Sequence, residues 1–235
     1  MRVQDQPVYI LHQRPFRDTS QILEIFSRDY GRLSLVSRGS RSPKSRLKAI
    51  LQPFQALQAN WSGRGEMPSL GQVEAAHINR PHLKARALPC AFYMNELIMR
   101  LLHKHDVHED VFELYQGTLY ALALSEDIEL ELRLFEKSLL QYLGFGLCLD
   151  TDADSGERVV KDRNYHYFIE HGPVQAGSYQ DKDRQALSIR GHSLLCFQSD
   201  DLTDKTVRKD IKSLMRYVLA YYLGDKPLKS RELFR

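Results

Sequence analysis

A dense group of cations occupies residues 37–48, which read SRGSRSPKSRLK and contain no acidic residue. Arginine donates forked hydrogen bonds to phosphate oxygens, and the backbone amides of serine and glycine add further donors. Like charges this close together repel one another unless an anion neutralises them. The segment therefore favours contact with a phosphate backbone, and the alternative is a plain solvated loop. The cations are Arg38, Arg41, Lys44, Arg46 and Lys48.

A second group of cations lies on a helix predicted from Asp204 to Leu223. The apolar residues that we expect to face inward are Val207, Ile211, Leu214, Val218 and Tyr222. Cations recur every three or four residues opposite this stripe, so they could form a second phosphate-binding surface. The alternative, a solvated face that Asp204 and Asp210 partly balance, is equally compatible with the sequence. The cations are Lys205, Arg208, Lys209, Lys212 and Arg216.

Residue patterns for catalysis are missing from the sequence. It has no Walker-type glycine-rich loop, no HExxH, no GxSxG and no paired carboxylates that can be assigned to a cleft. We therefore expect no enzymatic activity, no catalytic residue and no cofactor.

One acidic run resembles a calcium loop in its spacing. Asp150, Asp152 and Asp154 alternate as the first ligands of such a loop do, but Ser155 stands where glycine is needed and Lys161 where the closing acid is needed. We expect residues 150–157 to form an exposed loop without calcium.

Histidines and cysteines do not make a convincing metal site either. His103, His105 and His108 lie with Asp106 near the predicted end of a helix, where the helix dipole favours imidazoles without any metal. The three cysteines are far apart and form no CxxC motif, which excludes a disulfide framework. We expect no bound metal.

The chain as a whole has the composition of a globular protein with an uneven charge. It has 235 residues, of which 43% are hydrophobic and 27% charged. Residues 1–80 carry twelve Lys and Arg against six Asp and Glu, whereas residues 81–150 carry six against eleven. No apolar run is long enough for a membrane span or a signal peptide, so we expect a soluble cytosolic protein. The basic first third predicts a polyanionic partner there.

Two kinds of element must position these residues. Five short runs up to residue 79 have the apolar and polar alternation of strands, and SRDYGR between the second and third predicts a hairpin in which Gly31 adopts positive φ. Helical periodicity follows in residues 88–104, 110–125 and 129–144, and NYHYFIEHG indicates a strand that ends in a turn. We predict an α+β protein with a five-stranded barrel of the oligonucleotide/oligosaccharide-binding (OB) type in residues 1–80, or alternatively an SH3-like barrel, and a mainly helical domain in residues 81–235.

Aromatic residues in the first domain could stack on nucleic-acid bases. The candidates are Phe16, Tyr30, Phe54 and Trp61, although packing in the core or at the rim is the favoured interpretation for each.

Five segments in order resemble the RecO family of bacterial recombination mediator and repair proteins. They are SRGSRSPKSRLKAILQPF, GRGEMPSL, FYMNELIMRLL, LRLFEKSLLQYLGFG and KPLKSRELF, and together they extend over almost the whole chain. The resemblance implies an N-terminal OB domain, a helical C-terminal domain, binding to single- and double-stranded DNA, and annealing of complementary strands. It also implies RecR, RecA and the C-terminal tail of single-stranded DNA-binding protein as partners, and a cytoplasmic, nucleoid-associated location.

One departure from the RecO pattern concerns zinc. Many RecO proteins have a four-cysteine zinc module after the LGFG segment, whereas this chain offers only Cys148 and, later, Cys196. Two thiolates cannot complete such a site. We therefore expect no zinc, with ordinary turns in its place.

The resemblance also assigns a role to Arg133. This arginine matches the family's arginine in the LR-x-FE segment, and its guanidinium would bind the terminal carboxylate of the single-stranded DNA-binding protein tail. The alternative is a structural role, in which Arg133 pairs with Glu129 or Glu136 or packs its stem on the surface.

Functions outside repair remain alternatives at this point. An OB-containing RNA-binding adaptor or scaffold would use the same cationic loop, and a nuclease ranks third because no catalytic motif accompanies it.

Overall fold

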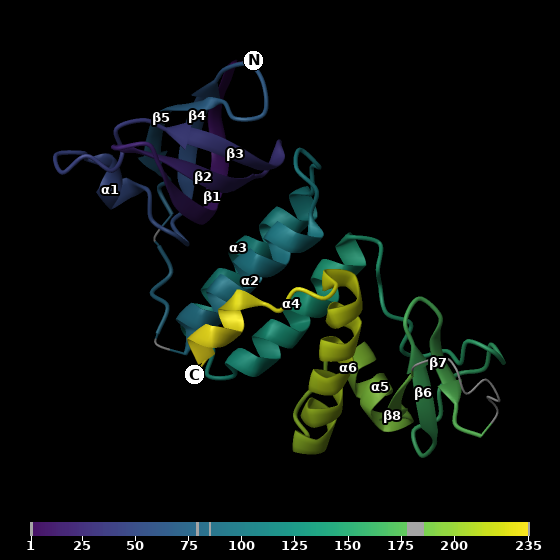
Figure 1. Ribbon diagram of the computed structural model, residues 1–235. Coiled ribbons are helices and arrows are strands. Elements are labelled where there is room, and N and C mark those ends of the chain that lie inside the picture. The colour runs from purple at the N-terminus through teal and green to yellow at the C-terminus, as the bar shows by residue number, and fades with distance from the viewer. Residues whose placement is uncertain (1, 79, 85, 178–185, 235) are drawn as a thin grey trace. The chain divides into compact units, whose positions relative to one another are not determined.

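The protein forms two compact units. The computed structural model describes residues 2–78, 80–84, 86–177 and 186–234 (Figure 1). The first unit comprises Met1–Ile128 together with Pro227–Arg235, and the second comprises Glu129–Lys226. The last nine residues of the chain therefore belong to the unit that contains its N-terminus.

The first unit is built on a closed five-stranded barrel (Figure 1). Its strands are β1 (Arg2–Phe16), β2 (Ser20–Ser27), β3 (Gly31–Ser37), β4 (Leu57–Ser62) and β5 (Ser69–Ala75), in the order β1-β2-β3-β5-β4. All neighbours are antiparallel except β3 and β5, which meet in parallel at Val36 and Ser69. The barrel and the β2–β3 hairpin confirm the predicted α+β fold, and the closed ring agrees with an OB-type barrel.

The first strand is longer than its apolar pattern indicates because it pairs with two other strands. Its beginning pairs with β4 and its end with β2, and register shifts bend it between Val3 and Gln6 and between Ile10 and His12. A strand that must curve around a small barrel needs such irregularities.

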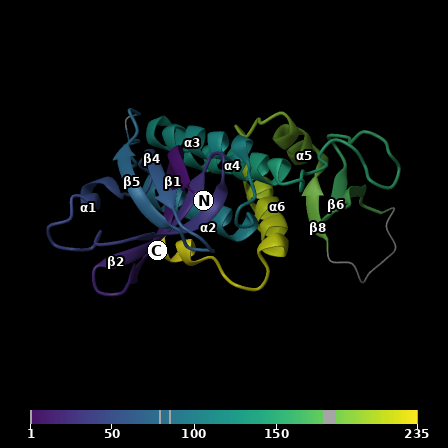
Figure 2. The ribbon, with the colours of Figure 1, turned by 90° about the horizontal axis from the view of Figure 1, so that it is seen from above.

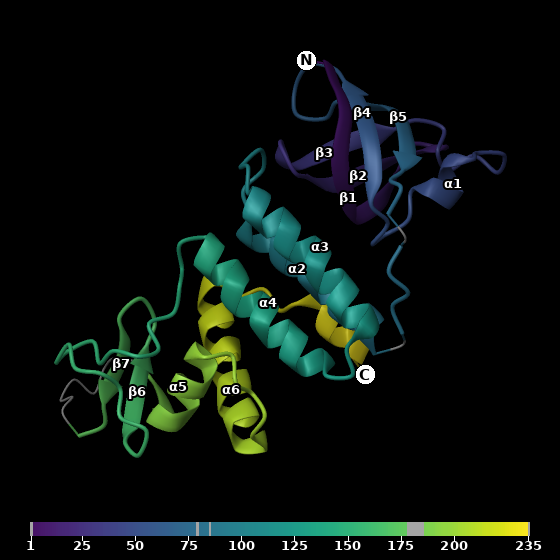
Figure 3. The same cartoon turned by 180° about the vertical axis from the view of Figure 1, so that it is seen from behind.

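Two helices pack against the barrel within this unit. Helices α2 (Ala87–Leu101) and α3 (Glu109–Leu124) lie side by side (Figure 3). The ring of Tyr9 lies 5.5 Å from Phe112 and 5.1 Å from Tyr115 between centroids, and Phe26 lies 5.5 Å from Phe112. The barrel and these helices thus share an aromatic contact, and a domain boundary at residues 80 and 81 stays a prediction.

The chain end returns to α2. The 3-10 helix η1 (Lys229–Phe234) is held by Glu96, whose carboxylate accepts hydrogen bonds from the amides of Lys229 at 2.9 Å and Ser230 at 2.8 Å. Burial alone would raise the pKa of Glu96, but these bonds lower it below its usual value.

The second unit combines helices with a small sheet. It contains all but the first residue of α4 (Ile128–Tyr142), together with β6 (Asn164–Phe168), β7 (Gly172–Gln175), β8 (Leu187–Arg190), α5 (Gly191–Gln198) and α6 (Lys205–Leu223). The sheet is antiparallel in the order β7-β6-β8, and β8 leads directly into α5 (Figure 2). The predicted final helix is confirmed, and its N-cap is Asp204, which accepts hydrogen bonds from the amides of Thr206 and Val207.

The prediction of an exposed loop at residues 150–157 is wrong for Asp152. Its side chain is buried and accepts hydrogen bonds from the amides of Asp154, Ser155 and Gln175 at 3.1, 2.9 and 2.7 Å. Burial would raise the pKa of Asp152, but these bonds outweigh it and hold the pKa below its usual value. The carboxylate thus ties the turn to the last residue of β7.

Candidate nucleic-acid interface

The cationic loop, residues 37–48, connects β3 to β4 and is anchored at its base. The amide of Arg41 donates a 2.8 Å hydrogen bond to the carbonyl of Thr19, and the buried hydroxyl of Ser40 donates one of 3.0 Å to the carbonyl of Ser37. At its far end, Leu47 and Ile50 of the short helix α1 (Leu47–Ile50) pack against the barrel core. The loop therefore presents its cations from a barrel to which both ends are fixed.

All five predicted cations of this loop are exposed. Within the part of the chain that the structure describes, none of them forms an ion pair. Arg41 donates to the carbonyls of Arg17 at 3.3 Å and Asp18 at 3.5 Å. The positive charge of the cationic loop is therefore not neutralised by the described acids.

Two further cations beside this loop were missed by sequence reasoning. The contact of Arg41 with the β1–β2 turn places the exposed Arg17 next to the cationic loop, and Arg14 is exposed near the end of β1. They lie more than 20 residues earlier in the chain, and the pairing of β2 with β3, which sets Gln21 opposite Ser37, brings the β1–β2 turn to the start of the cationic loop.

The candidate stacking residues are mostly structural. Trp61 and Phe54 are buried, and Tyr30 packs edge-on against Trp61 at 5.3 Å between ring centroids. Phe16 is half-buried, and the guanidinium of Arg17 lies 5.1 Å from its ring centroid. Only Phe16 and Tyr30 retain some exposure to solvent.

The cations of α6 fall into two groups. Lys205, Lys209 and Arg216 are exposed, whereas the guanidinium of Arg208 hydrogen-bonds the carbonyl of Leu202 and Lys212 lies 2.7 Å from a carboxylate oxygen of Glu129. The neighbouring acids that could partly balance these cations have other hydrogen-bond partners in the structure.

Those acids bind elsewhere in the described chain. Asp204 caps the helix, and Asp210 accepts hydrogen bonds from Arg190 at 2.9 Å and from Ser193 at 2.7 Å. The three exposed cations on α6 consequently form no ion pair with a described residue.

Arg133 lies on α4 in a nearly buried ion pair. Its guanidinium is 2.7 Å from a carboxylate oxygen of Glu136, one helical turn later, and the side chains of Arg133 and Glu136 are 11% and 0% exposed. The pairing with Glu136, one of the two interpretations of this arginine, is therefore present. A tail carboxylate would have to share the guanidinium with Glu136.

Candidate metal ligands are dispersed. No group of three or more His, Cys, Asp or Glu side chains that could hold a metal ion occurs among the described residues. His108 instead lies 3.0 Å from Asp106, and Asp152 is occupied by the backbone amides of its own turn.

In the described part of the chain, no helix is both long and apolar enough to cross a bilayer.

A closed OB-type barrel with unneutralised cations on one connecting loop is typical of nucleic-acid-binding proteins. The family model described as Recombination protein O N terminal matches residues 1–79, and the one described as Recombination protein O C terminal matches residues 82–232. The chain therefore belongs to the RecO family of DNA repair proteins.

Relatives named DNA repair protein RecO are similar over the full length. The chain is 43% identical to that of Methylococcus capsulatus over 227 residues, which are 97% of this chain and 91% of the relative. It is 41% identical to that of Dechloromonas aromatica, covering 100% and 96%, and 41% identical to that of Nitrosococcus oceani, covering 99% and 93%.

Proposed function

We propose that this RecO-family protein is a recombination mediator. It binds single- and double-stranded DNA, anneals complementary strands and, with RecR, helps load RecA onto DNA coated with single-stranded DNA-binding protein. The observation that carries the proposal is the cationic loop, with five exposed cations that no described acid neutralises.

The physical task in annealing is to neutralise two phosphate backbones at once. Each lysine or arginine that contacts a phosphate releases condensed counterions, which supplies affinity without regard to sequence. No bond is made or broken, so an acid, a base or a metal is not required, and we propose a role without catalysis.

A second DNA strand would need a second cationic surface. On α6 the exposed Lys205, Lys209 and Arg216 provide it, while Arg208 and Lys212 would contribute only if they exchanged their present partners for phosphate. We propose a larger share for the three exposed residues.

The tail of single-stranded DNA-binding protein would bind at Arg133. An arginine that is 11% exposed and already ion-paired is preorganised, because its fork is fixed before the ligand arrives. The tail's terminal carboxylate would then take the donors that Glu136 leaves open.

The decisive experiment measures annealing of complementary oligonucleotides coated with the cognate single-stranded DNA-binding protein. We expect the protein to accelerate annealing above the spontaneous rate, and RecR and RecA can then be added to follow filament formation. No acceleration would overturn the proposal. Stronger competition by structured RNA than by single-stranded DNA would instead favour the RNA-binding adaptor.

A further inference from the structure

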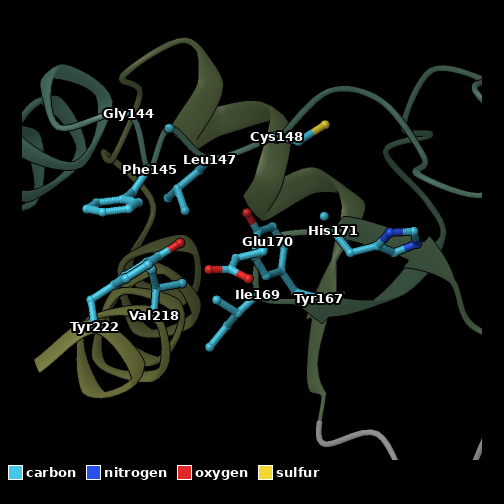
Figure 4. A pocket seen from close by; sticks show the side chains of 12 residues that line it. Gly144, Phe145, Leu147, Cys148, Tyr167, Ile169, Glu170, His171, Val218 and Tyr222 are labelled. Atoms are coloured by element: carbon cyan, nitrogen blue, oxygen red, sulfur yellow. The ribbon is translucent and has the colours of Figure 1, made fainter. Parts of the chain in front are cut away.

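A pocket of about 270 Å³ opens in the second unit (Figure 4). It is formed by the segment after α4, the turn between β6 and β7, and helix α6. Its volume is just below the range of about 300–1,000 Å³ that is usual for small-molecule sites. The pocket therefore fits one amino-acid side chain better than a cofactor. The residues used below are Phe145, Leu147, Ile169, Glu170, Val218 and Tyr222.

Aromatic rings form one wall of the pocket. Phe145 and Tyr222 stack with their centroids 4.4 Å apart and their planes at 28°, and Phe145 is 38% exposed. Tyr222, which we expected to face inward, is only half-buried. Leu147, Ile169 and Val218 add aliphatic surface. The wall thus offers a flat apolar face at the surface of the protein.

One carboxylate lines the pocket beside these apolar groups, that of Glu170, whose side chain is exposed to solvent. Its side chain points toward Tyr222 (Figure 4), and it has no hydrogen bond or ion pair within the described ranges. Burial and then the Glu170 carboxylate raise the pKa of Tyr222 above its usual value. The other ionisable side chain at the turn, His171, points away and lies 2.9 Å from Asp154.

The backbone of Glu170 supports a role for its side chain. Its φ is +63°, a left-handed conformation that glycine or asparagine adopts at lower cost. A glutamate here is not what the turn itself requires. The carboxylate is therefore held beside the aromatic wall against a local preference.

Charge and shape together select the occupant. A phosphate would be repelled by Glu170, and a purely apolar side chain would desolvate the carboxylate without giving it a partner. A guanidinium suits both the aromatic wall and the carboxylate, because its plane stacks on aromatic rings while its fork pairs with a carboxylate. An ammonium offers a point charge but no planar face.

We propose that this pocket binds an arginine side chain presented by a partner polypeptide. The proposal goes beyond the mediator role, because it uses neither the cationic loop nor the cations of α6. It makes this face of the second unit a protein-docking surface whose partner carries an exposed arginine.

The test is a titration of the ¹⁵N-labelled full chain with N-acetyl-arginine amide, followed by NMR. We expect saturable shifts confined to residues 144–148 and 169–172 and to the end of α6. N-acetyl-citrulline amide has nearly the same shape without the charge, and it should bind at least about tenfold more weakly. N-acetyl-lysine amide should bind more weakly than the arginine compound.

Variants assign the binding to the pocket. Glu170→Gln removes the charge and keeps the shape, so we expect at least about tenfold weaker arginine binding with an otherwise unchanged spectrum. Tyr222→Leu should also weaken binding, because it removes the ring face. Glu157→Gln is the matched control, since Glu157 is exposed in the same unit and does not line the pocket, and it should bind like the wild type.

Four outcomes would overturn the proposal. They are the absence of saturable binding, equal binding of the citrulline compound, equal binding of the lysine compound, and unchanged arginine affinity in Glu170→Gln.

Discussion

The side-chain amide of Asn95 donates a 2.9 Å hydrogen bond to the backbone carbonyl of Leu11 and thereby joins helix α2 to the long strand β1. The same side chain accepts a 2.6 Å bond from the hydroxyl of Tyr115 on α3. All three groups are buried, and the pKa of Tyr115 is raised by burial, so its phenol remains a donor. One asparagine thus connects the barrel with both helices of the first unit.

Asn95→Ala should lower the free energy of unfolding by about 1–3 kcal/mol for each buried polar group that it leaves without a partner. Tyr115→Phe deletes only one of the two bonds and should cost less, about 1 kcal/mol. Urea denaturation of the two variants measures both values. Equal stability of Asn95→Ala and the wild type would show that this connection contributes nothing.

Gly31→Ala should be much more destabilising than Gly39→Ala. Both glycines have positive φ, +61° and +66°, so each alanine has a backbone cost of about 1–2 kcal/mol. A Cβ at residue 31 would lie 2.0 Å from the carbonyl oxygen of Asp106, whereas one at residue 39 would meet nothing within 4 Å. The overlap should add roughly 1–3 kcal/mol. Comparing the thermal unfolding of the two alanine variants isolates the cost of this overlap. Equal losses of stability in both variants would exclude a close approach at Gly31.

Replacing four cations of the cationic loop by alanine should weaken DNA binding and flatten its dependence on salt. Each lost phosphate contact lowers the slope of log K against log salt by about 0.7–0.9. Folding should be intact, because these side chains are exposed. Filter binding at several salt concentrations measures the slope. The residues to replace are Arg38, Arg41, Lys44 and Arg46.

A matched control removes four other exposed cations outside this loop. It should retain most of the wild-type slope although its net charge changes equally. Slopes that are the same in both variants would mean that net charge, and not the cationic loop, determines binding. The control residues are Arg80, Lys84, Arg86 and Arg158.

Asp152→Asn should destabilise the protein at neutral pH, because an amide nitrogen cannot accept the bonds that the two carboxylate oxygens receive. The folded pKa of Asp152 lies below its usual value, so its contribution is complete above about pH 4 and is lost as the pH falls through the folded pKa. The stability difference between wild type and variant should therefore shrink between pH 6 and pH 3. Denaturation at several pH values tests this, with Glu157→Gln as the control, and a constant difference would contradict it.

Arg133→Ala should weaken binding of a peptide with the tail sequence of single-stranded DNA-binding protein by about 1.5–3 kcal/mol, the range for hydrogen bonds to charged groups. Binding of a bare oligonucleotide should stay near normal. Fluorescence anisotropy with labelled peptide and labelled DNA measures both affinities on the same protein.

Glu136→Gln is the informative companion, because it weakens the pair with Arg133 but keeps the guanidinium. It should leave peptide affinity equal or higher. If it lowers peptide binding as much as Arg133→Ala does, the two residues act through helix structure and Arg133 does not contact the tail.

Elements with a strong local pattern could be predicted from the sequence. Alternating apolar residues defined the strands, Gly31 marked the hairpin, and Asp204 marked the start of α6. Strand β8 and helix α5 were missed because each has eight residues or fewer and no clear periodicity. Short elements of this kind depend on tertiary packing more than on their own sequence.

The candidate sites likewise divide into features that the sequence shows and features that depend on the fold. Exposure of the cationic loop followed from its composition, since five cations without acids cannot be buried. The partner of Lys212 could not be predicted, because Glu129 lies 83 residues away. The pocket that we propose to bind arginine could not be predicted from the sequence either, because it assembles three segments that only the fold brings together.

The return of Pro227–Arg235 to the first unit has a consequence for biosynthesis. A ribosome that makes roughly 5–20 residues per second releases the barrel with α2 and α3 first, and the inserted segment Glu129–Lys226 then takes roughly 5–20 seconds. During that interval Glu96 has neither Lys229 nor Ser230 to bind. Residues synthesised after the inserted segment therefore complete the unit that begins to form first, and a nascent chain that stops before them leaves that unit unfinished.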